Sequence, residues 1–438
     1  MQSGGTGGWL GFSHGYGLFV VGGLDLPRLT DALAEGFGVS AAEIGVAAAG
    51  DTPAACPVVC AYRSVTGDVS WHLEIRVREG APDPPGGRAL GQILAARLAR
   101  PVLYEAELFR PSAYWVVTPD GTHGRARLHG PQQQQSRQQE ARQQQESRQQ
   151  EARRQQESQH GSRRGSRGGG GGGQAGGRRA GRPVGQPARQ PLGQPVGRPV
   201  YVLDAAEVPV PGLPNVPVEI IYEAIGDRCG FAFAEALRRI VDALADCCPQ
   251  ARTAVLRGSL ATDTADRYSD FDLVWTVPDA DFAACVDAVP SALNAAHPLL
   301  LPARSDPDFH ARPDRRLLFL TFRDLPLFWR LDLEVRAESG SPAGPAAPAG
   351  GGWPLSVSAL ANAVAAVKAV KRDRPDAARG LLDRGFERVG SDRRATGRWP
   401  EDIRRLAAEA EAEAAEEEGE GVRAFADRVR GLVATELE

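Results

Sequence analysis

Four carboxylates in two short segments could carry chemistry in this chain of 438 residues. Asp270 and Asp272 are two residues apart at the start of the apolar run Phe-Asp-Leu-Val-Trp, and Asp332 and Glu334 alternate with leucine and valine in Leu-Asp-Leu-Glu-Val. Residues two apart in a β-strand point to the same face. We therefore expect strands over 269–275 and 329–335, each presenting a pair of carboxylates. Such hard oxygen ligands on neighbouring strands suit Mg²⁺.

A short strand over 253–256 is expected to run into the turn Arg257-Gly258-Ser259, which then enters a helix. Glycine has no side chain to obstruct a phosphate that approaches the backbone. Backbone N–H groups and a hydroxyl can then bind that phosphate. Two Mg²⁺ ions held by carboxylates about 3.5–4 Å apart can clamp the attacking and leaving oxygens of an in-line phosphoryl displacement. The two features together predict phosphoryl-transfer chemistry.

The sequence GSLATDTADRYSDFDLVW (258–275), followed by LDLEV (331–335), resembles nucleotidyltransferases of the DNA polymerase beta superfamily. The resemblance covers roughly 230–337. It implies that Asp270, Asp272 and Asp332 are ligands of two Mg²⁺ ions, and that Ser259, with Gly258, holds a phosphate of a nucleoside triphosphate. It leaves open whether Glu334 or Asp332 takes the proton from the acceptor.

The chain departs from the family pattern at Asp263, where many members have glycine in the turn after Gly-Ser. If Asp263 lies near the triphosphate, its charge weakens binding. The alternative is that Thr262 and Asp263 only cap the turn.

The region after 355 is expected to be helical. Val357, Leu360, Val364 and Val367 recur at the spacing of an amphipathic helix, and further helices are expected over 377–386, 404–418 and 422–437. In the small-molecule nucleotidyltransferases that the chain resembles, a helical domain supplies a lysine to the triphosphate. Lys368 is the candidate for that role, with the margin of an ordinary helical surface as the alternative. Lys371 is the only other lysine.

Residues 1–129 are expected to form a separate small α/β domain. Strands are indicated over 18–21, 58–62, 71–77 and 114–117, and helices over 26–37 and 88–100. Residues 1–129 contain no set of side chains whose types and spacing indicate catalysis. We expect this domain to bind a protein partner or to regulate.

Residues 130–200 are rich in Gln, Arg, Gly and Pro and poor in large apolar side chains, so they cannot form a core. An 11-residue repeat occupies 136–157. The segment has 13 arginines and four glutamates, a charge of +9, which leaves −13 for the rest of the chain. Without aromatic residues to stack on bases, nucleic-acid binding is not expected. We predict a disordered linker.

Composition excludes other classes of protein. No uninterrupted apolar run approaches the length of a membrane helix, and the first residues lack the basic region of a signal peptide. The six cysteines, at 56, 60, 229, 247, 248 and 285, are too sparse for a disulfide scaffold and lack zinc-site spacing. The expected location is the cytoplasm, with free thiols and no membrane partner.

The sequence thus predicts an α/β (α+β) nucleotidyltransferase fold over 201–339 and a helical bundle over 340–438. The expected enzyme transfers a nucleoside monophosphate, with AMP the first expectation, from a Mg²⁺-bound nucleoside triphosphate to a hydroxyl of a small molecule, and releases pyrophosphate. A protein acceptor, as in antitoxin-like nucleotidyltransferases, is the second possibility. A non-catalytic nucleotide-binding or regulatory protein is the third.

Overall fold

The computed structural model describes residues 12–51, 56–79, 83–106, 113–131, 133–134, 198–262, 264–305, 312–340, 354–414 and 419–438. The 136–157 repeat, most of the 130–200 segment and Asp263 lie outside these residues. The described chain forms two compact units. The first is formed mainly by residues before 106 and by 127–204, and the second mainly by 115–126 and 205–438. Within the described ranges, the helices all lack the length or the continuous apolar surface that a membrane span requires.

The first unit is built on a mixed sheet in which β2, β3, β5, β1 and β6 are neighbours in that order. Its elements include β1 (Phe12–Val20), α1 (Leu26–Phe37), β2 (Ile44–Ala48), β3 (Val58–Ser64), β5 (Trp71–Arg78), α2 (Gly87–Leu98) and β6 (Val102–Glu105), with η1 (Ala41–Glu43) and β4 (Thr66–Gly67) as short pieces. The alternating pattern of 71–77 is confirmed as β5, whose Leu73, Ile75 and Val77 are buried.

The sequence prediction for α1 is also confirmed. The Asp25 side chain accepts a hydrogen bond from the Arg28 backbone N–H at 3.1 Å, and Gly38 ends the helix in the left-handed conformation. Both are preferred helix-terminal residues, because each satisfies backbone groups that the helix itself leaves unpaired. The next strands, β7 (Ala113–Val117), β8 (His123–His129) and β9 (Val200–Ala206), each have residues in both units.

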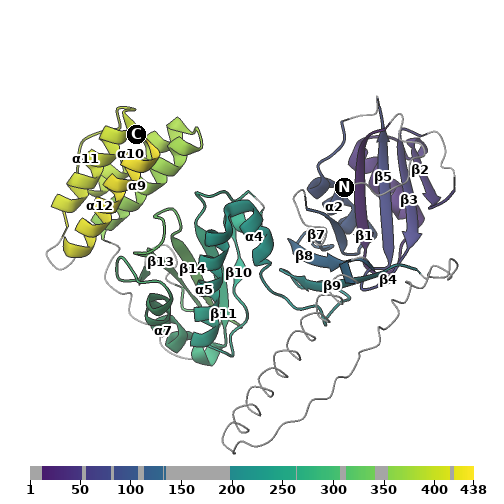
Figure 1. The fold of residues 1–438 in the computed structure, drawn as a ribbon, viewed down its shortest axis with the longest axis horizontal. Helices are drawn as coiled ribbons and strands as arrows, with labels where there is room; N and C mark the ends of the chain where they lie inside the picture. Colours follow the sequence, from purple (N-terminus) through teal and green to yellow (C-terminus); the bar gives the residue numbers. More distant parts are fainter. Residues whose placement is uncertain are drawn as a thin grey trace, which may run out of the picture. The chain divides into compact units, whose positions relative to one another are not determined.

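The second unit contains a five-stranded sheet of order β10-β11-β14-β13-β12 (Figure 1). Its elements are α4 (Tyr222–Cys229), α5 (Phe231–Cys247), β10 (Val255–Leu256), α6 (Gly258–Ala261), β11 (Phe271–Val277), η2 (Asp279–Asp281), α7 (Phe282–Ala296), β12 (Arg304–Ser305), β13 (Arg315–Leu320) and β14 (Leu331–Ala337). Strands β11 and β14 are parallel, and the other pairs are antiparallel.

One face of this sheet packs into the core. Phe271, Leu273 and Trp275 of β11 are almost completely buried and share a hydrophobic cluster with residues of α5 and α7. The residues between them, including Asp272, belong to the opposite face and are half-buried. The alternation therefore gives the sheet one apolar face and one face that is free for polar side chains.

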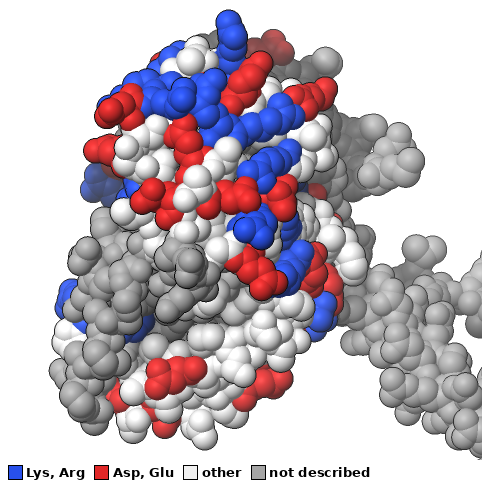
Figure 2. Space-filling model, turned by 90° about the vertical axis from the view of Figure 1, so that its left-hand side faces the viewer, with Lys and Arg blue, Asp and Glu red and all other residues white. Residues whose placement is uncertain are grey.

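Four helices follow as a bundle: α9 (Leu355–Lys371), α10 (Pro375–Arg388), α11 (Trp399–Ala412) and α12 (Gly419–Glu436) (Figure 1). The predicted apolar stripe of α9 is confirmed in part, because Leu360, Val364 and Val367 are buried in the bundle core. Acidic and basic side chains are interspersed on the upper part of the face in Figure 2. Within the bundle, Glu411 of α11 pairs with Arg423 and Arg430.

The fold is therefore α+β with two mixed sheets. The predicted strands and helices of both units are present, although β1 begins six residues before the strand predicted over 18–21. Helix α11 begins five residues before the helix predicted over 404–418, and residues 415–418 lie outside the described chain. All six cysteines are free. Sequence analysis did not indicate α4, α7, β2, β6, β8, β9 or β12. Helix α7 contains Pro290 in its interior, and proline usually argues against a helix at that position.

A buried ion pair lies next to α6. Arg125 and Glu207 are 4% and 9% exposed. The Glu207 carboxylate accepts hydrogen bonds from the Arg125 backbone N–H (3.0 Å), from Arg125 Nη1 (3.1 Å) and from the Ile221 backbone N–H (3.1 Å). Arg125 Nη2 donates to the Leu260 carbonyl at 2.8 Å. The pair thus connects β8, the start of α4 and the α6 turn.

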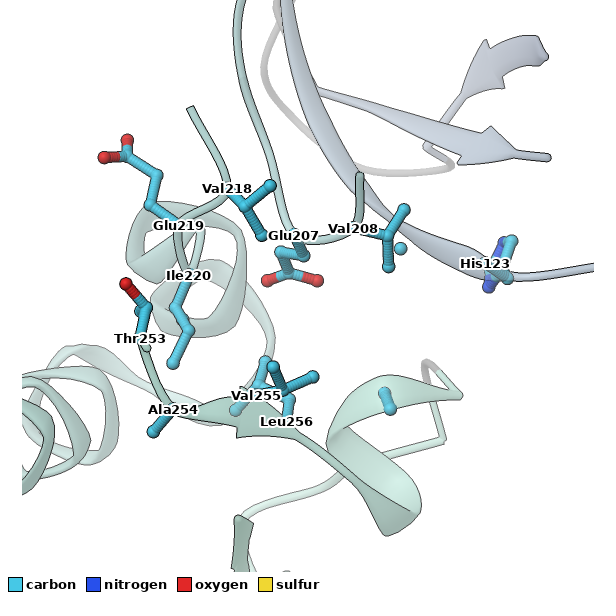
Figure 3. Close-up of a pocket in the computed structure, with 12 residues that line it drawn as sticks. His123, Glu207, Val208, Val218, Glu219, Ile220, Thr253, Ala254, Val255 and Leu256 are labelled. Carbon is cyan, nitrogen blue, oxygen red and sulfur yellow. The ribbon is translucent and has the colours of Figure 1, made fainter. Parts of the chain in front are cut away.

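A small cavity adjoins this pair. It has a volume of about 30 Å³ and is lined by His123, Glu207, Val218 and Leu256, among other residues. Figure 3 shows the Glu207 carboxylate directed into the cavity and Glu219 directed away from it.

We predict that Glu207→Ala destabilises the second unit by about 3–5 kcal/mol, because it leaves the Arg125 guanidinium buried without its carboxylate. Unfolding of the full chain in denaturant measures the effect. The matched control is Glu235→Ala, which removes an exposed partner of Arg238 and leaves the midpoint close to that of the unmodified chain. Equal midpoints for the two variants would contradict a structural role for the buried pair.

Candidate active site

The structure brings together three of the aspartates that the sequence singled out. Strands β11 and β14 run parallel with Asp272 directly opposite Asp332. Asp270 precedes β11 by one residue, on the same face as Asp272. All three lie where the two parallel strands begin, on the face of the sheet that is not packed against the core.

The three carboxylates interact electrostatically. Burial, together with the charges of Asp270 and Asp332, raises the pKa of Asp272 to about 6. Burial is also the main reason that the pKa of Asp332 is raised, and the charge of Asp270 adds to it. Metal and catalytic sites often contain several acidic side chains, each of which makes ionisation of the others less favourable.

Two cations compensate this charge. Lys368 Nζ, on α9, lies 3.3 Å from Asp270 Oδ2, and its side chain is 15% exposed. Arg330 binds both oxygens of Asp332, with Nε and Nη2 each 2.7 Å away. Lys371 instead pairs with Glu436, so only one of the two lysines reaches the aspartates. Arg330 was not among the residues predicted from the sequence, although its place two residues before Asp332 puts it on the same face.

The Gly258 turn lies against Asp272. Gly258 has a φ of 55°, and a Cβ atom at this position would lie 2.1 Å from Asp272 Oδ2. The Arg257 backbone N–H donates to the Asp272 carbonyl at 2.8 Å. Glycine is therefore required here both by the left-handed backbone and by the approach of the carboxylate. Ser259 Oγ donates to Ser269 Oγ at 3.1 Å.

A second network, absent from the sequence prediction, joins the loop before Asp270 to the end of α9. Arg372 binds the Asp266 carboxylate through Nε (2.9 Å) and Nη2 (2.6 Å). Ser269, which is completely buried, donates to the same carboxylate at 3.2 Å. Bidentate arginine–carboxylate contacts have a defined geometry. This network thus holds the helix of Lys368 close to Asp270.

Glu334 is not brought into the group of three aspartates. It follows Asp332 by two residues and is held by Arg257, Arg315 and Arg336. Burial alone would raise the pKa of Glu334, but the hydrogen bonds from Arg336 and the charges of Arg257 and Arg315 hold that pKa below its usual value. A carboxylate stabilised in this way is a poor proton acceptor.

A small cavity opens beside Asp270 and Lys368. Its volume is about 50 Å³, and its apolar wall comes from α9, from Leu327 and Phe328, and from Phe425 of α12. The cavity therefore offers an apolar surface next to the charged groups.

The chemistry of the aspartates fits Mg²⁺, because the group offers carboxylate oxygens and no soft ligand. As the side chains stand, no three His, Cys, Asp or Glu residues of the described part of the chain are arranged around a common metal position. Lys368 and Arg330 contact the oxygens of Asp270 and Asp332 instead. A bound ion would have to displace these cations from the oxygens.

Comparison with known proteins adds no family to this description, since neither a protein-family model nor a curated sequence matches the chain. The interpretation of the site therefore depends on its own residues.

We predict that the ionisation of Asp272 lowers the stability of the metal-free protein as the pH rises from about 4 to above 6. The pKa of Asp272 is about 6 in the folded protein, whereas that of an unperturbed aspartate is 3.8. Between these values the folded state retains a proton that the unfolded state has released, so a rise in pH favours unfolding. Asp272→Asn should flatten this dependence, measured as Tm against pH in EDTA. Asp246→Asn, an exposed change in α5, should retain it. A profile unchanged by Asp272→Asn would count against the electrostatic interaction.

Proposed function

We propose that the second unit is a nucleotidyltransferase. It transfers a nucleoside monophosphate, with AMP as the first expectation, from a Mg²⁺-bound nucleoside triphosphate to a hydroxyl of a small molecule. The observation that carries this proposal is the contact of the Gly258 turn with Asp272, which itself lies in register with Asp332. It supports a phosphate-binding turn and a group of metal-binding carboxylates within one site.

Asp270, Asp272 and Asp332 would hold Mg²⁺. When bound, the metal supplies charge neutralisation for the triphosphate and for the attacking and leaving oxygens. The neighbouring carboxylates contribute to the raised pKa values of Asp272 and Asp332. A bound cation would reduce this repulsion between the three carboxylates.

The triphosphate would bind between the Gly258 turn and Lys368. Gly258 presents backbone without a side chain, and Ser259 carries a hydroxyl next to it. Lys368 contributes a compact positive charge, for which a phosphate oxygen is a natural partner. Burial lowers the pKa of Lys368, although Asp270 opposes that shift. Arg372 positions α9 through Asp266.

In the transfer step, the acceptor hydroxyl oxygen forms a bond to the α-phosphorus. The bond from that phosphorus to the bridging oxygen breaks, and pyrophosphate leaves with the electron pair. Asp332 accepts the hydroxyl proton. The place of Asp332 opposite Asp272, within the group of aspartates, supports this assignment, whereas Glu334 is stabilised in its ionised form by three arginines.

A small-molecule acceptor is the first expectation, because the chain resembles small-molecule nucleotidyltransferases that carry a helical domain after the catalytic one. A protein acceptor would instead appear as a change of intact mass in a protein incubated with the enzyme and nucleotide.

The two lysines provide a matched test of nucleotide binding. We predict that one nucleoside triphosphate raises Tm in the presence of Mg²⁺, by the equivalent of about 2.7 kcal/mol at 100 times its Kd. Lys368→Ala should weaken the binding about tenfold or more, because it removes a charge-assisted contact. Lys371→Ala, which affects only the Glu436 pair, should bind as the unmodified chain does.

The double change Asp270→Ala, Asp272→Ala should remove the Mg²⁺ dependence of this shift in Tm. Absence of a shift with every nucleotide would refute the proposed function.

The proton acceptor can be identified from rates. Asp332→Asn is expected to lower kcat by about 10²-fold or more, whereas Glu334→Gln changes kcat less, since only the former removes the general base. Pyrophosphate release with an acceptor found by screening measures both. A larger loss of kcat in Glu334→Gln would reassign the base to Glu334.

A further inference from the structure

A cluster of three arginines occupies the polar face of the sheet beyond the aspartates. Arg257, Arg315 and Arg336 surround Glu334, and we call these four residues the arginine cluster. Arg257 Nη1 lies 2.7 Å from Glu334 Oε2, Arg315 Nη1 lies 3.3 Å from Oε1, and Arg336 Nε lies 2.7 Å from Oε1. The arginines come from three places in the chain and converge on one carboxylate.

The cluster has more positive charge and more donors than Glu334 can satisfy. Three guanidinium groups face one carboxylate, a net charge of +2. Glu334 already accepts four hydrogen bonds, which is about the capacity of a carboxylate. The buried Nε of Arg315 has no hydrogen-bond partner among the described residues. The side chains of Arg257 and Arg336 are 53% and 43% exposed.

The acidic residues next to the ends of β13 and β14 do not cancel this excess. The Asp314 carboxylate pairs with Arg312, and its negative charge also helps to raise the pKa of Arg336. Glu338 binds Arg252. Each acid is thus matched by an arginine of its own, and the arginine cluster keeps its net charge.

The cluster has a defined distance from the proposed reaction centre. Glu334 and Arg336 follow Asp332 on the same strand and the same face. With a rise of about 3.3 Å per residue, they lie about 7 and 13 Å beyond it. Arg257 immediately precedes Gly258 and reaches over β11 to Glu334. An anion bound here would therefore be within reach of a small molecule whose hydroxyl is at Asp332.

We propose that the acceptor carries a phosphate group, and that the arginine cluster binds this phosphate about 7–13 Å from the reacting hydroxyl. This inference rests on the proposed function and adds the class of its acceptor. A phosphate monoester carries nearly two negative charges at neutral pH, which matches the net charge of the cluster, and arginine binds phosphate oxygens in pairs. The same charge opposes polycationic amino sugars.

A small phosphorylated molecule fits better than a nucleic acid. A nucleic acid is usually bound along a track of basic residues, but the arginine cluster is compact.

The experiment measures binding of glucose 6-phosphate, glucose and inorganic phosphate to the full chain by calorimetry. Each titration is done with and without Mg²⁺ and a non-hydrolysable nucleoside triphosphate analogue. The test variant is the double change Arg315→Gln, Arg336→Gln. The control is Arg393→Gln, Arg423→Gln, which makes the same change of charge on exposed bundle residues. Circular dichroism and Tm establish that each variant is folded.

We expect glucose 6-phosphate and phosphate, but not glucose, to bind the unmodified chain and the control. The test variant should bind them about tenfold or more weakly and should bind the analogue normally. No phosphate binding to the unmodified chain, or equal weakening in the control, would overturn the proposal. So would competition between phosphate and the analogue, which would assign the cluster to the triphosphate.

Two further outcomes separate this inference from the function on which it rests. If the analogue fails to bind while phosphate binding is lost only in the test variant, the anion site stands and the nucleotidyltransferase fails. If a single-stranded RNA oligomer binds through the cluster and glucose 6-phosphate does not, the small-molecule acceptor is overturned.

Discussion

The repulsion between three aspartates at the start of two parallel strands is the constraint on which this site depends. Asp272 and Asp332 are directly opposite each other, and their charges, together with burial, oppose full ionisation. Like charges at such a position destabilise a fold unless cations compensate them. Lys368 and Arg330 do so from two different elements, and the bundle is thereby linked to the sheet through charge as well as through apolar contacts.

The rest of the second unit holds these charges in place. The Gly258 turn contacts Asp272 from one side, and the Arg125–Glu207 pair anchors the same turn from below through the Leu260 carbonyl. On the opposite side, Arg372 fixes the end of α9 to the loop that leads to Asp270. The site is therefore assembled from segments that lie up to about 250 residues apart in the chain, a long-range arrangement that is usual for catalytic sites positioned by a rigid scaffold.

The polar face of the sheet is divided by charge. The end at Asp270, Asp272 and Asp332 is acidic, and the strands continue into a basic region around Glu334. Alternation along β14 places Asp332, Glu334 and Arg336 on this one face. The acidic region attracts cations and the adjacent basic region attracts anions, so this face can hold a cation and an anion side by side.

The sequence by itself determined the strands that carry the aspartates, the glycine turn and the helix of Lys368, because these depend on local alternation, spacing and backbone freedom. It also placed Asp270, Asp272 and Asp332 on neighbouring strands, but the parallel pairing that sets Asp272 opposite Asp332 was seen only in the structure. Only the tertiary structure decided the roles of the arginines. Arg330, Arg372 and the residues around Glu334 are ordinary in sequence, in a chain whose basic residues are nearly all arginine. Their partners lie on other strands and helices, and pairing across elements depends on strand register and helix docking, which no local pattern encodes. By alternation along β14, Glu334 is equivalent to Asp332. Its environment differs from that of the aspartates because the fold brings three arginines to it, and no local pattern predicts these contacts.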